Sequence, residues 1–275
     1  MAYTPLIPMS GLAGWRFLER TSERQQAAFE KSAEVGRQVA YFKEKIGSVT
    51  SAADLLGDRR LLTFALTAFG LEKDVDKKAF LRKVLEDDLL EPKALANRLS
   101  APEYKQMAEA FGFNGGGKGS TATPGFADRI VAAYKTRAFE AAVGAVNDDM
   151  RLALNFRRTI ADLSKGETGG SWYKVIGSNP LREVFETAYG LGSAFGKVDV
   201  DRQRDILRDK TSKMFGTENL TAFAKPENVE KLINRFLARA QMEGGGGSTA
   251  SSPALTLLQG ASGGASGLFN LILSR

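Results

Sequence analysis

Residues 56–71 read LGDRRLLTFALTAFGL, and residues 176–191 read IGSNPLREVFETAYGL. Six pairs of residues are identical between the two stretches: Gly57/Gly177, Leu61/Leu181, Thr67/Thr187, Ala68/Ala188, Gly70/Gly190 and Leu71/Leu191. Each stretch places apolar residues at helical spacing between a polar start and a closing glycine, which predicts a short helix with defined ends. Because the stretch occurs twice, we predict that the chain contains a duplicated helical unit.

The duplication extends beyond this stretch, because other short strings recur in the same order. Three such pairs are Ala28-Phe29-Glu30 with Ala138-Phe139-Glu140, Asp74-Val75-Asp76 with Asp199-Val200-Asp201, and Phe80-Leu81-Arg82 with Ile206-Leu207-Arg208. We therefore predict two pseudo-repeated helical bundles, over residues 20–112 and 125–243. Each is too long for a solenoid repeat and has the size of a small domain.

Three segments lie outside the predicted bundles. Residues 1–19 form an apolar N-terminal segment, which we expect to pack against the body or against a partner. Residues 113–124 are rich in glycine and predict a flexible linker between the bundles. Residues 244–275 predict a flexible Gly/Ser-rich tail, whose two apolar clusters are too small to build a core of their own.

Helical periodicity runs through most of the chain. Residues 10–46 predict one long helix or a broken pair of helices, and residues 128–165 predict a second long helical stretch. The strict alternation of apolar and polar residues that marks strands is scarce. The sequence therefore predicts an all-α fold.

Polar residues mark where several helices begin. Asp58 is the expected N-cap of the helix in the first quoted stretch, and Ser178 or Asn179 is the expected N-cap in the second. The string Ser100-Ala101-Pro102-Glu103 has the pattern of a capping box, which predicts a reciprocal pair of side-chain contacts at a helix start.

Composition lowers the expectation of catalysis. Neither cysteine nor histidine occurs among the 275 residues. The chain thus lacks a thiol nucleophile, the usual general base and the commonest metal ligand. We predict that the protein is not an enzyme, has no catalytic or metal-binding residues and uses no cofactor or small-molecule substrate.

One glycine-rich string resembles a phosphate-binding loop. Residues 112–118 (GFNGGGK) match the first seven positions of that motif, but Gly119 stands where a serine or threonine should hold magnesium. The string also follows a predicted helix rather than a strand. We therefore expect no nucleotide site here and interpret the string as part of the linker.

Charge and hydropathy limit the classes of partner. The 38 Lys and Arg exceed the 32 Asp and Glu by six, and the excess is spread along the chain rather than concentrated in a basic stripe. Nucleic-acid binding is therefore not expected, although a pI of about 9.4 keeps a DNA-binding regulatory protein as an alternative. We expect no membrane span and no cleaved secretory signal.

Apolar residues near both ends of the chain are candidates for docking a partner. Trp15, Phe17 and Leu18 lie in the N-terminal segment, where core packing and an assembly face explain the pattern equally well. In the tail the candidates are Leu257, Leu258, Leu268, Phe269 and Ile272. We predict that removing residues 244–275 leaves the helical content and melting temperature nearly unchanged but abolishes binding of a partner.

Three strings carry a resemblance to a known family: residues 14–29 (GWRFLERTSERQQAAF), residues 124–140 (PGFADRIVAAYKTRAFE) and residues 151–158 (RLALNFRR). Over residues 5–243 the chain resembles domain-of-unknown-function family 1217, which is found in alphaproteobacterial flagellar gene clusters. The resemblance implies a role in motility. It implies no catalytic residue.

The resemblance and the composition together give the expected function. We predict a non-enzymatic structural or assembly protein of the bacterial flagellum, whose partners are other flagellar proteins or further copies of itself. The expected location is the flagellum, reached by export without a cleaved signal, or the cytoplasm. Besides the DNA-binding protein, a less favoured alternative is a carboxylate-dependent peptidoglycan hydrolase, which needs a cleft with two acids, one of them with a raised pKa.

Overall fold

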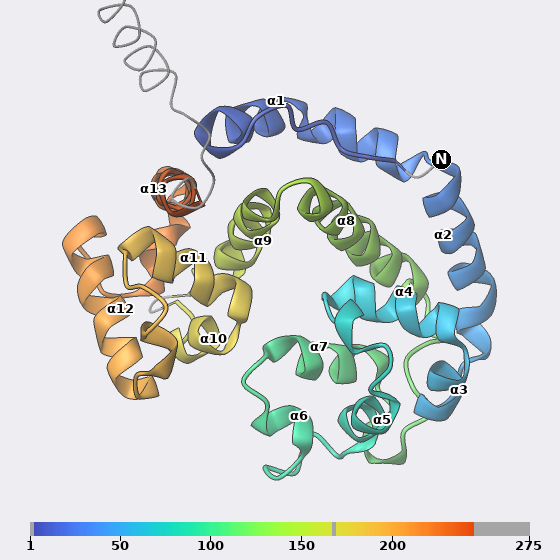
Figure 1. The fold of residues 1–275 in the computed structure, drawn as a ribbon. Coiled ribbons are helices and arrows are strands. Elements are labelled where there is room, and N and C mark those ends of the chain that lie inside the picture. Colours follow the sequence, from blue (N-terminus) through green and yellow to red (C-terminus); the bar gives the residue numbers. More distant parts are fainter. Residues whose placement is uncertain (1–2, 167–168, 245–275) are drawn as a thin grey trace, which may run out of the picture. The chain divides into compact units, whose positions relative to one another are not determined.

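The computed structural model describes residues 3–166 and 169–244 and confirms the all-α prediction (Figure 1). The five predicted tail residues that could dock a partner, from Leu257 to Ile272, lie outside this part of the chain. The described residues up to Arg239 form one compact unit. No helix in the described part of the chain has the length and hydropathy that crossing a bilayer would require.

Thirteen α-helices follow one another along the described residues. They are α1 (Gly11–Glu30), α2 (Ala33–Lys45), α3 (Ala52–Gly57), α4 (Arg59–Phe69), α5 (Lys78–Glu86), α6 (Leu95–Arg98), α7 (Pro102–Phe111), α8 (Phe126–Val146), α9 (Asp148–Leu163), α10 (Trp172–Gly177), α11 (Asn179–Tyr189), α12 (Val200–Phe215) and α13 (Pro226–Gly244). Short 3₁₀ turns lie at η1 (Ile46–Ser48), η2 (Glu72–Asp74), η3 (Asn114–Gly116), η4 (Phe195–Lys197) and η5 (Leu220–Ala224).

Both long helical stretches predicted from periodicity are pairs of helices. The first breaks between α1 and α2, where the Ser32 side chain accepts a hydrogen bond from the backbone N–H of Val35. The second breaks at Asn147, whose side chain accepts from the N–H of Met150 at 3.1 Å and so starts α9. The first break agrees with one of the two predicted arrangements. The second was not predicted, because Asn147 sits inside an otherwise continuous helical pattern.

The two quoted stretches fold in the same local way. In each, a helix of six residues ends at a glycine, one cap residue follows, and a helix of 11 residues ends at a glycine with left-handed backbone. The cap residues are Asp58 and Ser178, and the closing glycines are Gly70 and Gly190. This likeness covers α3–α4 and α10–α11. The doubling of whole bundles stays a prediction.

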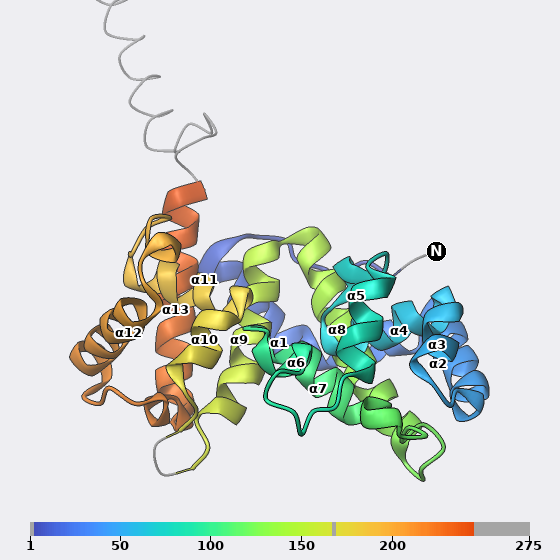
Figure 2. The same ribbon diagram turned by 90° about the horizontal axis from the view of Figure 1, so that it is seen from below.

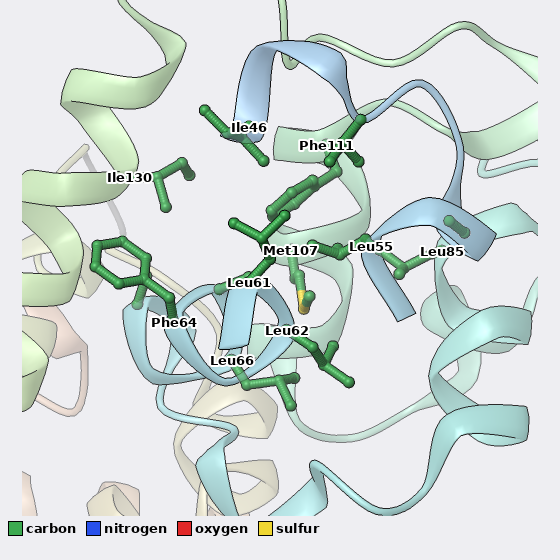
Figure 3. Close-up of a cluster of buried hydrophobic side chains, with 14 of the residues drawn as sticks. Ile46, Leu55, Leu61, Leu62, Phe64, Leu66, Leu85, Met107, Phe111 and Ile130 are labelled. Atoms are coloured by element: carbon green, nitrogen blue, oxygen red, sulfur yellow. The ribbon is translucent and has the colours of Figure 1, made fainter. Parts of the chain in front are cut away.

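The core around α4 crosses the predicted boundary between the bundles. Phe126, Ile130 and Val131 of α8, which fall in the second predicted bundle, belong to the same buried cluster as Phe42 and Phe64 of the first. Helix α8 lies directly against α4 in both views (Figures 1 and 2), and Ile130 points into the cluster (Figure 3). The first predicted bundle therefore shares its core with the first helix of the second, rather than ending at residue 112.

The predicted linker between the bundles packs against the unit. Phe113 is buried in the core cluster, and the buried Thr121 hydroxyl donates a hydrogen bond to the Val49 carbonyl at 2.5 Å. A Cβ on Gly119 would lie 2.4 Å from the Phe113 ring, so the glycine allows the loop to close over that ring. The phosphate-loop lookalike within it follows helix α7, as expected, and not a strand.

The N-terminal segment folds back along α1. The Gln25 side chain bridges both backbone groups of Leu6, accepting from its N–H at 2.7 Å and donating to its carbonyl at 3.0 Å. The Tyr3 ring packs edge-on against Phe29. A Cβ on Gly14 would lie 1.8 Å from the Met9 carbonyl oxygen, so only glycine permits this return. The segment packs against the body, and α1 runs through the predicted boundary at residue 19.

Candidate functional site

The predicted docking residues at the N-terminus lie mostly in the core. Trp15 and Leu18 are each 0% exposed, and Phe17 is half-buried. Core packing, one of the two roles left open by the sequence, is therefore the role that Trp15 and Leu18 have here. Neither can contact a partner unless α1 moves, so a docking role for the segment needs surface from its neighbours.

An ionic cluster fixes α1 to α9 and α13. The Arg157 guanidinium lies over the Trp15 ring, with its centre 4.6 Å from the ring centroid. Its Nη2 contacts the carboxylate of Glu19 and that of Glu230, the latter at 2.6 Å. The indole N–H of Trp15 donates to Glu230 Oε2 at 3.5 Å. One arginine thus joins three helices and covers the tryptophan.

A groove of about 440 Å³ opens beside this cluster. Its lining residues are Glu19, Arg157, Ala161, Ser164, Phe223, Ala224, Pro226, Val229 and Glu230. Phe223 and Val229 are buried side chains, whereas Ala161, Ala224 and Pro226 are exposed. The groove therefore combines an apolar surface with an ionic edge at Arg157.

A second, smaller pocket of about 130 Å³ lies where elements of both predicted bundles meet. It is lined by Gly70, Leu71, Glu72, Glu103, Arg137, Glu140, Ala141, Arg151, Asn155, Ser178, Asn179 and Pro180. These residues come from the end of α4, the start of α7, the centres of α8 and α9, and the start of α11. We call it the polar pocket.

Buried hydrogen bonds between α8 and α9 build one wall of the polar pocket. Arg158 holds the buried carboxylate of Glu140 with two bonds, Nε to Oε1 at 2.7 Å and Nη2 to Oε2 at 3.1 Å. The Asn155 amide, oriented with its oxygen toward the arginines, accepts from Arg137 at 3.2 Å and from Arg158 at 2.9 Å. Two-bond pairing of this kind is among the stronger polar contacts in proteins.

The side chain of Arg137, a residue of α8, reaches the C-terminus of α4. A Cβ on Gly70 would be 2.9 Å from Arg137 Nη1, so the guanidinium sits against the glycine that ends the helix. Burial lowers the pKa of Arg137 and the charge of Arg158 lowers it further, whereas the carboxylates of the pocket act in the opposite direction. The group nevertheless stays charged at neutral pH. The same arrangement recurs at Gly190, where a Cβ would lie 2.4 Å from Arg239 Nη1.

The first glycine of each quoted stretch, Gly57 or Gly177, has different surroundings. A Cβ on Gly177 would lie only 2.2 Å from the Ser100 carbonyl oxygen, so the α10–α11 junction and the loop before α7 touch through backbone. The equivalent Gly57 has nothing within 4 Å of its Cβ position. The glycine of the second stretch is therefore needed for contact between the two parts of the chain, and that of the first is not.

Two acids elsewhere in the unit, the half-buried Asp149 and the exposed Glu183, have raised pKa values. Desolvation raises the pKa of Asp149 and of Glu183, and in each case the charge of Asp148 raises it further. Neither residue lines the polar pocket. Within residues 3–166 and 169–244, no group of three or more acids is placed to hold a metal ion.

The residues of the polar pocket were not predicted as site residues, although one signal was present. Arg137 and Glu140 are three residues apart, as are Asn155 and Arg158, so each pair shares a helix face. Each pair lies next to buried aromatic residues, Phe139 and Phe156. A polar pair beside an apolar stripe on two consecutive helices indicates a buried polar contact, but only the structure shows that the pairs meet.

The family model described as "Protein of unknown function (DUF1217)" matches residues 68–229, which is more than half of the 275 residues. The crystal structure of a protein from Agrobacterium tumefaciens is similar, with a TM-score of 0.71 and 30% sequence identity over 87% of this chain and 99% of that chain. None of the curated proteins matches the sequence. The resemblance expected from the three strings is thereby confirmed, and the chain belongs to the DUF1217 family of proteins of unknown function.

Proposed function

We propose that this protein is a non-enzymatic structural or assembly component of the bacterial flagellum. It docks other flagellar proteins, or further copies of itself, through helical faces and terminal segments. The family resemblance suggests the flagellar setting. The groove between α1, α9 and α13 is the observation that carries the docking role, because it offers apolar surface beside the N-terminal segment singled out from the sequence.

The chemistry of the groove defines the kind of partner. Its apolar lining suits one or two aliphatic side chains on a helix or turn of the partner. At its ionic edge, Glu19 and Glu230 share the single cation of Arg157, which leaves one negative charge in excess. The groove therefore favours a partner segment that presents a lysine or arginine next to its apolar residues.

Genetic complementation tests the proposal in the bacterium that encodes the chain. Deleting the gene is expected to reduce swimming in soft agar, and the intact gene is expected to restore it. Genes carrying Ala161→Glu or Ala224→Glu place a carboxylate on the exposed apolar surface of the groove and should fail to restore swimming. Ala132→Glu is the matched control, because Ala132 is also an exposed alanine on a helix but lies outside the groove.

Two further measurements show whether each variant is folded and where the protein is located in the cell. Circular dichroism of each purified variant must match that of the parent, since exposed alanines should tolerate glutamate without unfolding. Immunodetection in sheared flagella and in the cell fraction then locates the protein. Normal swimming of the deletion strain, together with absence of the protein from flagellar fractions, would refute the flagellar role. Restoration of swimming by both groove variants would refute docking at the groove.

A further inference from the structure

Charged groups of opposite sign line the polar pocket without pairing with one another. In the described part of the chain, Arg137 has no carboxylate within 4.0 Å, and neither Glu72 nor Glu103 has a cationic group within that distance. The other two charged residues of the lining are already paired, Arg151 with Asp148 and Glu140 with Arg158. One cation and two carboxylates therefore face the cavity without an ionic partner.

Arg137 and Glu103 are half-buried and Glu72 is exposed, so the first two charges are only partly hydrated. A partly buried charge that lacks a counter-charge loses hydration without gaining an ion pair. Water can solvate each group separately, but a molecule that carries both charges can satisfy the arginine and the carboxylates at once. The Ser178 side chain, also on the wall, makes no cap bond to α11, so its hydroxyl is available to a ligand.

The size of the pocket limits the ligand. Its volume of about 130 Å³ is enough for water molecules or for one small polar molecule. That space suits a molecule with the size of glycine, alanine or serine.

We infer that the polar pocket binds a small zwitterion of the α-amino acid class. The ligand carboxylate pairs with the Arg137 guanidinium and accepts from the Ser178 hydroxyl. The ligand ammonium lies toward the carboxylates of Glu72 and Glu103. Because the walls come from α4, α7, α8, α9 and the start of α11, a bound ligand joins elements of both predicted bundles.

Thermal unfolding and titration calorimetry of the full chain test this inference. Glycine, L-alanine and L-serine are the ligands, and an equimolar mixture of methylammonium and acetate is the control that carries the same charges on separate molecules. At a concentration tenfold above Kd, a ligand that binds only the folded state is expected to raise the melting temperature by about 3 °C. The mixture of separate ions should produce no such rise.

Three variants assign binding to the pocket. Arg137→Gln should abolish binding, and Glu103→Gln should weaken it at least about tenfold by removing one carboxylate from the ammonium side. Arg239→Gln is the matched control, because Arg239 lies against Gly190 as Arg137 lies against Gly70 but does not line the pocket. It should bind like the parent. If Arg137→Gln fails to fold, Glu103→Gln at the half-buried surface decides the matter.

Either of two results overturns the inference. Absence of heat and of a melting shift with all three amino acids at about 10 mM, ten times above a Kd of about 1 mM, indicates that water alone fills the pocket. Binding that Glu103→Gln leaves unchanged places the ligand elsewhere. Neither result bears on the flagellar role, which the groove variants test separately.

Discussion

Two structural constraints favour glycine at position 70 and at position 190, namely the backbone conformation of Gly70 and Gly190 and a neighbouring arginine. Their φ angles are +75° and +67°, which side chains other than glycine rarely adopt. An arginine also occupies the position of the missing side chain, Arg137 at Gly70 and Arg239 at Gly190. A guanidinium at the C-terminus of a helix lies near unpaired carbonyl groups and the negative end of the helix dipole. The glycines therefore end α4 and α11 and admit the cations that stabilise those ends.

Substitution of Gly70 by alanine should destabilise the protein by about 1–2 kcal/mol, because of left-handed strain, with a further loss from the displaced Arg137. Gly36→Ala is the matched control. Gly36 lies inside α2 with nothing within 4 Å of its Cβ position, so alanine there should stabilise by about 0.5–1 kcal/mol. Urea unfolding measures both free energies. Equal effects of the two substitutions would contradict the role given to Gly70.

Gly57 and Gly177 occupy corresponding positions in the two quoted stretches but have different neighbours in the structure. Both glycines end short helices in the structure, and the sequence shows only that their positions correspond. It cannot tell that Gly177 touches the Ser100 backbone while Gly57 faces open space, because the neighbour of Gly177 comes from a distant part of the chain. Identity between two stretches therefore indicates common local structure and not common packing.

Gly177→Ala should destabilise the protein by about 1–3 kcal/mol, since the new methyl group pushes the α10–α11 junction away from Ser100. Gly57→Ala should cause no loss, because its Cβ position is empty and its φ is not left-handed. Chemical denaturation of the two variants gives the comparison. If Gly57→Ala were the more damaging substitution, the contact at Ser100 would not be what requires a glycine.

At the scale of elements, cap residues decide where helices begin but not always through their side chains. Asp58 was predicted as the N-cap of α4, and its carboxylate accepts from the N–H groups of Arg60 and Leu61. Ser178 occupies the same place before α11 but makes no side-chain cap bond. The capping box expected at Ser100–Glu103 does not form, since Ala101 is the N-cap of α7. Proline in the first turn starts that helix instead.

Asp58→Ala should therefore cost about 1 kcal/mol of stability, within the usual range of about 0.5–2 kcal/mol for losing a cap. Ser178→Ala at the matching position should cost less, because no cap bond is lost. Thermal or urea unfolding of the pair checks the difference. A larger loss for Ser178→Ala would indicate that its hydroxyl makes a contact absent from this structure.

A buried acid joins the turn before α5 to α7 and makes stability depend on pH. Burial alone would raise the pKa of Asp74, but the Lys77 ammonium at 2.7 Å and the Tyr104 hydroxyl hold it below the ordinary value of 3.8. A lowered pKa in the folded state stabilises the fold above about pH 4, and this contribution is lost as the pH falls through the folded-state pKa.

Tyr104→Phe should lower stability at pH 7 by about 1–2 kcal/mol, the size of a hydrogen bond to a charged group. The difference from the parent should shrink as the pH falls through the lowered pKa of Asp74 and its carboxylate becomes protonated. Tyr173→Phe is the control, since Tyr173 bonds to Asp201 at the exposed surface, and it should leave stability unchanged. A difference that stays constant from pH 7 to pH 2 would contradict the role of the Asp74 charge.

At the scale of the whole molecule, periodicity and composition predict the all-α class and the ends of many helices, because these depend on neighbours in sequence. Sequence periodicity does not predict which helices share a core, because this depends on contacts between distant parts of the chain. Phe126 and Ile130 read as part of the second bundle but bury their side chains against α4. The polar pocket escaped prediction for the same reason, since Glu140 and Arg158 lie on different helices and meet only after α8 packs on α9.

Fragments of the chain separate the predicted division from the observed core. A fragment of residues 1–112 holds the first predicted bundle but lacks α8, which buries Phe126, Ile130 and Val131 against it. At about 1.5–3 kcal/mol for each buried side chain, their loss is comparable with the total stability of about 5–15 kcal/mol of a typical domain. We expect the 1–112 fragment to unfold without a cooperative transition, whereas residues 1–146, which include α8, should regain one.

Circular dichroism during heating compares the two fragments, and a pair of substitutions in residues 1–146 shows whether α8 acts through its buried face. Ile130→Asp places a charge in the core cluster and should abolish the cooperative transition. Ala132→Asp places the same charge on the exposed face of the same helix and should preserve it. A cooperative transition of residues 1–112 at the same temperature as residues 1–146 would show that the first bundle folds alone. The boundary drawn from the repeated sequence would then be a true domain boundary, despite the shared core.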